Sequence, residues 1–184
     1  DYFIDWEARI DREDPFYQHL LQERIGTSIL DLGCGSGGFS IHWAETGYNV
    51  VGIDSSSAMV QQAQKNAEEK EIDIEFQCLQ MTDFSNKIQQ QFDVIICVGN
   101  NLAHILEPIK LKRVFTETIK SMKPTGLAVF HILNYHRILD IKRRDFPARN
   151  REVNGNEYLF LRFYNFLKDF LEFNMVMAVK EDGQ

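Results

Sequence analysis

The sequence of 184 residues has little of what marks secreted, membrane-spanning or nucleic-acid-binding proteins. Its three cysteines form no Cys-x-x-Cys pair, which argues against a disulfide scaffold or a metal site. No apolar run approaches the roughly 20 residues of a membrane-spanning helix, and the first residues do not resemble a secretion signal. The net charge of −7 repels phosphate backbones. We therefore expect a cytoplasmic protein with no nucleic-acid or membrane partner.

The length and composition are those of one globular domain. Hydrophobic residues make up 44% of the chain and charged residues 26%, so the chain can bury a sizeable core. We expect a single domain with a helical N-terminal lid at 1–25, an α/β core at 26–134 and an appendage of a helix and a β-hairpin at 135–184.

Apolar strand patterns alternate with helical patterns along the first 134 residues. The expected strands lie near residues 27–32, 49–54, 72–79, 92–98 and 127–133, and the expected helices near 1–24, with an interruption at Pro15, 39–46, 55–69 and 111–122. Strands that alternate with helices predict right-handed crossovers. The fold class expected is therefore α/β, with a doubly wound, mostly parallel sheet and helices on both of its faces.

The C-terminal part departs from this alternation. Residues 158–166 and 170–179 each show a period of two, and Leu167-Lys168-Asp169 between them fits a short turn. This pattern predicts an antiparallel hairpin added to the parallel core. Its aromatic residues pack inside the protein, line a substrate pocket or form the surface of a homodimer, with core packing favoured.

A glycine-rich loop and two acids indicate a ligand site. Gly33-Cys34-Gly35-Ser36-Gly37 joins the first strand to a helix, where glycines allow a ligand to approach the backbone. The spacing of Gly33, Gly35 and Gly38 matches the dinucleotide fingerprint, and Asp54 lies where an acid binds an adenosine ribose. However, Asp31 would face a pyrophosphate badly and would attract an ammonium or sulfonium group. The ligand is therefore S-adenosylmethionine or, as the alternative, NAD.

Two segments resemble motifs of the class I S-adenosylmethionine-dependent methyltransferases. They are residues 29–37, ILDLGCGSG, and residues 51–59, VGIDSSSAM. The resemblance implies a Rossmann-like fold in which Gly33, Cys34 and Gly35 approach the methionine part of the cofactor. It also places Asp31 near the cofactor amino group and Asp54 on the ribose hydroxyls. The remaining cofactor contacts that it implies, around the adenine, are Ser55, Met59, Gln80, Met81 and Thr82.

Residues 98–104, VGNNLAH, resemble a motif of the glycine and sarcosine N-methyltransferase group. By this resemblance Val98 and His104 would touch the cofactor, and Asn100 would hold a substrate carboxylate. The group has an arginine for that carboxylate where this sequence has Leu133. This sequence therefore lacks the positive charge that the group uses to bind an amino-acid carboxylate. The acceptor expected is therefore a small molecule, with an amine favoured over an oxygen nucleophile, which would need a base such as His104.

Tyr2, Trp6 and Arg9 lie at helical spacing on the first segment. They either pack on the sheet or close over the cofactor as a lid, with an aromatic ring against the sulfonium. The choice stays open.

The function expected is transfer of a methyl group from S-adenosylmethionine to a small-molecule acceptor, with His104 and Asn100 as candidate catalytic residues. The alternatives are an NAD-dependent oxidoreductase and a non-catalytic cofactor-binding protein. The family usually completes its sheet with two more strands. Either the hairpin replaces them or the protein continues beyond residue 184.

Overall fold

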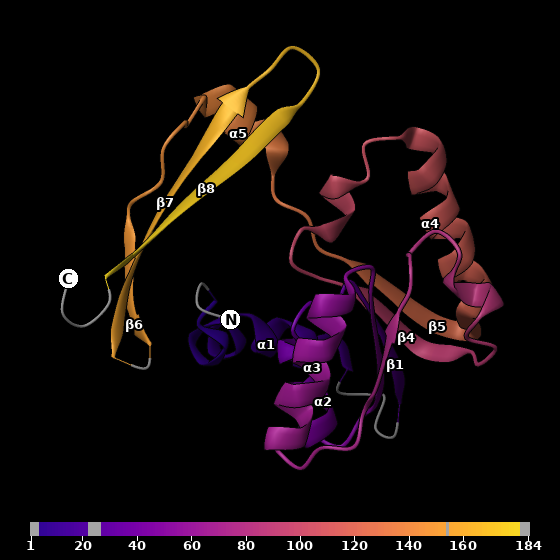
Figure 1. Cartoon of the computed structure of the whole chain (residues 1–184). Helices are drawn as coiled ribbons and strands as arrows, with labels where there is room; N and C mark the ends of the chain where they lie inside the picture. The colour runs from indigo at the N-terminus through magenta and orange to yellow at the C-terminus, as the bar shows by residue number, and fades with distance from the viewer. Residues whose placement is uncertain (1–3, 22–26, 154, 181–184) are drawn as a thin grey trace. The chain divides into compact units, whose positions relative to one another are not determined.

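The computed structural model describes residues 4–21, 27–153 and 155–180 (Figure 1). These residues divide into two compact units. The larger unit is Trp6–Leu133, and the smaller one comprises the chain from Asn134 onward together with residues before Trp6.

The larger unit contains a five-stranded sheet in which all neighbouring strands are parallel. The order is β3-β2-β1-β4-β5. The strands are β1 (Ser28–Leu32), β2 (Asn49–Asp54), β3 (Glu75–Cys78), β4 (Phe92–Cys97) and β5 (Met122–Phe130). Because the order reverses between β1 and β4, the crevice beyond their carboxyl ends is the expected place for a ligand. The doubly wound α/β fold is confirmed.

Helices cover both faces of this sheet (Figure 1). They are α1 (Trp6–Leu21), α2 (Gly38–Glu45), α3 (Ser57–Glu69) and α4 (Pro108–Ser121), with short 3₁₀ helices η1 (Phe84–Asn86) and η2 (Asn101–His104). Alternate strand residues point to opposite faces. Ile29 packs with Trp43 of α2, while its neighbour Leu30 packs in another cluster with Val114 of α4.

One sequence expectation about a proline is wrong. Helix α1 runs through Pro15 without a break. A proline inside a helix removes one backbone hydrogen bond, but the burial of Tyr17 and Leu21 beyond it outweighs that loss. Pro124 lies within β5, which tolerates it because β5 is an edge strand whose register with β4 shifts at this point.

The smaller unit contains a three-stranded antiparallel sheet where the sequence predicted a two-stranded hairpin. Its elements are α5 (Tyr135–Ile141), β6 (Arg149–Val153), β7 (Asn156–Phe166) and β8 (Leu171–Lys180), and the sheet order is β6-β7-β8. The hairpin of β7 and β8 is confirmed. Strand β6 was missed because its sequence, RNREV, has no apolar alternation. This sheet is separate from the parallel one.

Among the described residues, none of the helices combines the length and the apolar composition that a bilayer crossing would require.

A carboxylate joins three strands at the amino-terminal edge of the parallel sheet. Oδ2 of Asp93, at the start of β4, accepts hydrogen bonds from the backbone N–H of Ser28 at 3.0 Å and from its hydroxyl at 2.8 Å. The same oxygen accepts one from Lys123 Nζ at 2.8 Å. The hydrogen bonds from Lys123 and from the Ser28 backbone lower the pKa of Asp93 to about 2. The ionised form of Asp93 therefore stabilises the fold.

This lowered pKa predicts a loss of stability in acid. The pKa of Asp93 is below its ordinary value of 3.8, so its contribution to stability is present above about pH 4 and is lost as the pH falls towards about 2. We expect Asp93→Asn to lower the free energy of unfolding at neutral pH by about 1 to 2 kcal/mol and to flatten the decline between pH 4 and pH 2. Urea denaturation across this range measures both effects. The exposed Asp73→Asn is the control, and an unchanged acid decline in Asp93→Asn would contradict the prediction.

Candidate active site

The glycine loop turns from the end of β1 into α2 against the end of β2. The backbone N–H groups of Gly33 and Cys34 donate to the carbonyl oxygen of Ile53 at 2.8 and 3.0 Å. Gly33 has a φ of +77°, and a Cβ atom there would lie 2.5 Å from Nδ2 of Asn101. Both the backbone conformation and the space therefore require glycine at this position.

The carboxylate of Asp54, at the end of β2, is oriented by two backbone donors. Oδ2 accepts a hydrogen bond from the N–H of Gly35 at 3.0 Å, and Oδ1 accepts one from the N–H of Ser56 at 2.9 Å. Each carboxylate oxygen can accept a second hydrogen bond. Asp54 can therefore bind two adjacent hydroxyl groups of a ligand without losing its contacts to the glycine loop.

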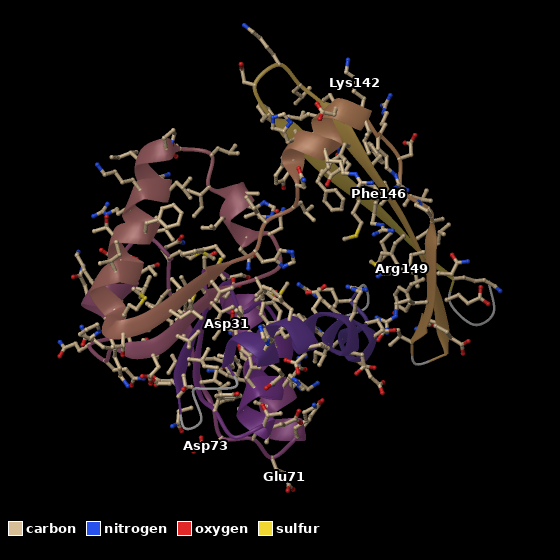
Figure 2. All side chains as sticks on the ribbon, turned by 180° about the vertical axis from the view of Figure 1, so that it is seen from behind. Asp31, Glu71, Asp73, Lys142, Phe146 and Arg149 are labelled. Atoms are coloured by element: carbon tan, nitrogen blue, oxygen red, sulfur yellow. The ribbon has the colours of Figure 1, made fainter. Side chains whose placement is uncertain are left out.

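Asp31 is a buried carboxyl at the end of β1, with 1% of its surface exposed (Figure 2). Its Oδ2 accepts a hydrogen bond from the hydroxyl of Ser40 at 2.6 Å, whereas its buried Oδ1 has no partner among the described residues. Burial raises the pKa of Asp31 to about 6, opposed by the Ser40 hydrogen bond; Asp54 raises it further and Arg9 lowers it. A buried carboxylate oxygen without a donor is unfavourable. The position therefore favours a ligand with a cationic donor.

A pocket of about 760 Å³ lies at the carboxyl edge of the parallel sheet. This volume is within the range of small-molecule sites. The lining residues are Gly33, Asp54, Ser55, Gln80, Met81, Thr82, Asn101, His104, Ile105, Leu106, Glu107 and Lys110. The structure thus brings together, from four separate segments, several of the residues that the sequence predicted as a site.

Six other predicted residues of this region do not line the pocket: Asp31, Cys34, Gly35, Met59, Val98 and Asn100. Cys34 and Val98 are buried, and burial raises the pKa of the Cys34 thiol. Met59 is 46% exposed on the first turn of α3. The predicted cofactor contacts of these residues stay predictions. The described residues contain no group of three or more His, Cys, Asp or Glu side chains that could hold a metal ion.

The loop after β4 is held by two residues in the left-handed conformation, Gly99 and Asn100, with φ of +76° and +72°. Oδ1 of Asn100 accepts a hydrogen bond from the N–H of Leu133 at 3.0 Å. This contact joins the loop after β4 to the segment after β5, so Asn100 has a structural role. His104 ends the following 3₁₀ helix, is exposed and lines the pocket.

Asn101 is a site residue that the sequence analysis missed. Its Nδ2 donates to the carbonyl oxygens of Gly33 and Val98, both at 2.7 Å. The amide therefore fastens the glycine loop to the end of β4 across the point where the strand order reverses. The sequence contained one signal for Asn101. It is the second of two asparagines that follow Gly99, shortly after a buried strand.

Two residues of the predicted lid lie against the glycine loop and the turn after β4. The ring of Trp6 occupies the space that a Cβ at Gly38 would need, and it makes an edge contact with Phe39 at 6.0 Å. The guanidinium carbon of Arg9 lies 5.2 Å from the Trp6 ring centroid, and Arg9 Nη2 lies 3.4 Å from the position a Cβ would take at Gly99. Neither residue lines the pocket, and Tyr2 lies outside the described residues.

A family model described as a methyltransferase domain matches residues 29–126, which is just over half of the chain. A glycine/sarcosine N-methyltransferase from Parasynechococcus marenigrum (strain WH8102) is 31% identical over 140 residues, which cover 76% of this chain and 50% of that protein. The chain belongs to the class I S-adenosylmethionine-dependent methyltransferases. The cofactor of this family is S-adenosylmethionine, which decides against the NAD alternative.

Another curated relative of this methyltransferase chain is named for methyl transfer to oxygen. A ubiquinone biosynthesis O-methyltransferase from Coxiella burnetii (strain RSA 493 / Nine Mile phase I) is 30% identical over 150 residues, or 80% of this chain and 58% of that protein. The PH0226 protein from Pyrococcus horikoshii OT3 has a TM-score of 0.69 at 28% identity, with 80% of this chain and 69% of that chain covered. The methyltransferase chain thus spans about half the length of the curated relatives it matches.

Replacing Asn101 tests whether the link between the two loops positions the cofactor. Asn101→Asp keeps the size of the side chain, removes both donated hydrogen bonds and places a negative charge beside two carbonyl oxygens. We expect the affinity of the methyltransferase for S-adenosylmethionine to fall by about tenfold or more, measured by isothermal titration.

The matched control is Asn66→Asp, since Asn66 Nδ2 donates to the carbonyl of Ser36 in the same loop without reaching β4. We expect a smaller loss of affinity there. An equal loss in both variants, or wild-type affinity in Asn101→Asp, would contradict a positioning role for Asn101.

Proposed function

We propose that the protein transfers a methyl group from S-adenosylmethionine to a small-molecule acceptor, with an amine favoured over an alcohol. The observation that carries this proposal is the buried Oδ1 of Asp31, which has no partner among the described residues and lies at the end of the strand that leads into the glycine loop. A polar site of this kind fits a ligand that combines a cationic end with a sugar diol.

The residues present fit the parts of this cofactor one by one. Asp31 would accept a hydrogen bond from the amino group, and the Arg9 guanidinium, near the turn after β4, would pair with the carboxylate. Asp54 would bind the two ribose hydroxyls, because both of its oxygens are already oriented by backbone donors. Gln80 and Met81 in the pocket wall would contact the adenine.

The bound cofactor supplies a methyl group on a cationic sulfur, which is already activated for displacement. The protein has to hold the acceptor nucleophile in line with that methyl group and keep water away. Trp6 and Arg9 from α1 would shield the methionine end of the site. We assign Asn100 to orientation of the acceptor, and His104 to removal of the proton that an ammonium group loses before it can react.

An amine acceptor is favoured because the pocket offers little to deprotonate an alcohol. The two carboxylates in its lining are already engaged, Asp54 with backbone donors and Glu107 with Lys110. The one other candidate base in this lining is His104, which is exposed to solvent. The matching relatives named for N-methylation of glycine and sarcosine support the same choice.

The pKa of Asp31 predicts how cofactor binding depends on pH. In the free protein this pKa is about 6, so below that pH the carboxyl is protonated and no longer attracts an ammonium group. We expect the dissociation constant of S-adenosylmethionine to be flat above about pH 7 and to rise nearly tenfold per pH unit below about pH 6. Isothermal titration between pH 5 and pH 8 measures this dependence.

Two comparisons isolate Asp31 in this measurement. Asp31→Asn should bind more weakly and lose the pH dependence, because the amide does not titrate. Methylthioadenosine, which lacks the amino-acid end, should bind to the wild-type protein equally at every pH. The proposal that Asp31 binds the amino group is wrong if methylthioadenosine shows the same pH dependence as S-adenosylmethionine.

Methyl transfer itself is tested with paired acceptors. Primary and secondary amines, each with the alcohol of the same carbon skeleton, are supplied with S-adenosylmethionine, and release of S-adenosylhomocysteine is measured. We expect turnover with an amine and at least about tenfold less with its alcohol partner. Turnover with alcohols alone would contradict the amine assignment. Tight cofactor binding with no turnover of any acceptor would favour a non-catalytic cofactor-binding protein.

A further inference from the structure

Strand β8 forms one edge of the antiparallel sheet in the smaller unit and is drawn in yellow in Figure 1. It has 10 residues, and its register with β7 continues without a bulge along its whole length. Side chains on both of its faces are exposed. The exposed fraction lies between 42% and 51% for Phe173, Met175, Val176, Met177 and Val179. A long, apolar edge strand of this kind is a template for pairing with another strand.

The two edges of this sheet differ in how they are protected against pairing. Strand β6, at the other edge, is short and has charged side chains at three of its five positions. Strand β8 contains no proline or glycine, and its charged residues are the second and the last, Glu172 and Lys180. Proteins block free edges with charges, prolines and bulges. The absence of these devices along β8 favours a strand that has a partner.

The backbone of β8 presents hydrogen-bonding groups along its outer edge, with which no strand pairs among the described residues. In β7 the N–H of Tyr164 and the carbonyl oxygen of Arg162 bond to the segment 144–146, at 2.7 and 3.1 Å, so both residues turn these groups away from β8. Residues opposite each other in an antiparallel pair either both face the partner strand or both face away. Phe173 and Met175 lie opposite Tyr164 and Arg162, so their N–H and C=O groups point outward, as do those of alternate residues further along. The outward-facing set is therefore Phe173, Met175, Met177 and Val179.

The apolar residues of β8 match one another when a second copy runs antiparallel to it. A two-fold axis perpendicular to the sheet at Val176 brings opposite each other the residues at equal distances from Val176. Met175 then lies opposite Met177 of the second copy, and Phe173 lies opposite Val179. All four belong to the outward-facing set, so each of these pairs exchanges two backbone hydrogen bonds. Their side chains meet on one face of the sheet as apolar cross-strand pairs.

The charged residues of β8 match in the same arrangement. Glu172 and Lys180 lie at equal distances from the axis, so each carboxylate lies opposite an ammonium group of the second copy. Oε2 of Glu172 accepts hydrogen bonds from Nδ2 of Asn165 at 2.8 Å and from Nδ2 of Asn174 at 3.2 Å. These neutral amides orient the carboxylate without neutralising it. Nζ of Lys180 lies 3.4 Å from Oε1 of Glu157 in its own chain and, with three donors, can bind both acids.

We propose that β8 pairs with β8 of a second copy, antiparallel about Val176, so that two three-stranded sheets join into one continuous sheet. The pairing uses the same surface of both copies, so it closes as a dimer. Moving the axis by one residue in either direction separates the opposite charges. With the axis at Met175, for example, Glu172 would lie opposite Ala178. This dimer goes beyond the proposed methyl transfer and does not depend on it.

Reversing one charge at a time and then mixing the variants tests the dimer and its register together. In a dimer with itself, Glu172→Lys places two ammonium groups opposite each other at both ends, and Lys180→Glu places two carboxylates there. Each variant alone should therefore have a dimer dissociation constant at least about tenfold above that of the wild type. An equimolar mixture restores opposite charges at both ends and should return to within about threefold of the wild type. Sedimentation velocity over a range of protein concentrations measures these constants.

Glu152→Lys is the matched control, because it makes the same change of charge at an exposed position of β6, the opposite edge of the sheet. It should change the dissociation constant by less than about twofold. Affinity for S-adenosylmethionine is measured in all the variants and should not change, so a failure of the proposed function is distinguishable from a failure of this proposal.

Amide hydrogen exchange locates the interface. The N–H groups of the outward-facing set should exchange more slowly as the protein concentration rises and the dimer forms. Slow exchange of these groups in a monomeric protein would show that a segment of the same chain covers the edge, which would overturn the proposal.

Three results of the sedimentation experiment would also overturn the proposal. The first is a wild-type protein that stays monomeric at every concentration. The second is growth beyond a dimer, which a closed pairing does not allow. The third is a mixture of Glu172→Lys and Lys180→Glu that dimerises no more tightly than either variant alone.

Discussion

A carboxyl group buried with only one hydrogen-bond donor determines the chemistry of the site. Side chains of β1 point alternately to the two faces of the sheet, and that of Asp31 points to the face that carries α2. There the hydroxyl of Ser40 donates a hydrogen bond to one of its oxygens. Asp54, one strand over, carries a second negative charge and raises the pKa of Asp31. Two carboxyl groups at neighbouring strand ends thus create a negative potential that favours a cationic ligand.

The strand order brings the loops that surround these carboxyl groups together. Because β1 is flanked by β2 on one side and β4 on the other, the loops after these three strands converge at one edge of the sheet. Asn101 and the glycine loop bridge the gap between β1 and β4, and Asp54 bridges the gap between β1 and β2. The side chains that face the ligand are thereby held by the same hydrogen bonds that hold the loops.

The sequence predicts the parallel core well because its signals are local. Apolar runs closed by glycine or aspartate located β1 and β2 to within a residue or so, and the predicted Gly33 and Asp54 line one pocket. It failed where tertiary context decides. Pro15 is tolerated because Tyr17 and Leu21 beyond it are buried, and β6 is a strand because β7 supplies its hydrogen bonds. Asn101 was missed because one of its two acceptors, Gly33, is distant in sequence, and the other, Val98, is a buried residue just after β4.

Burial and pH act together on the carboxyl site. The fold buries Oδ1 of Asp31 without a partner among the described residues, and a cationic donor would complete its hydrogen bonding. The same burial raises the pKa of Asp31 to about 6, so this group changes charge close to neutrality. The attraction that Asp31 exerts on a cation is therefore strongest above this pKa and declines in acid.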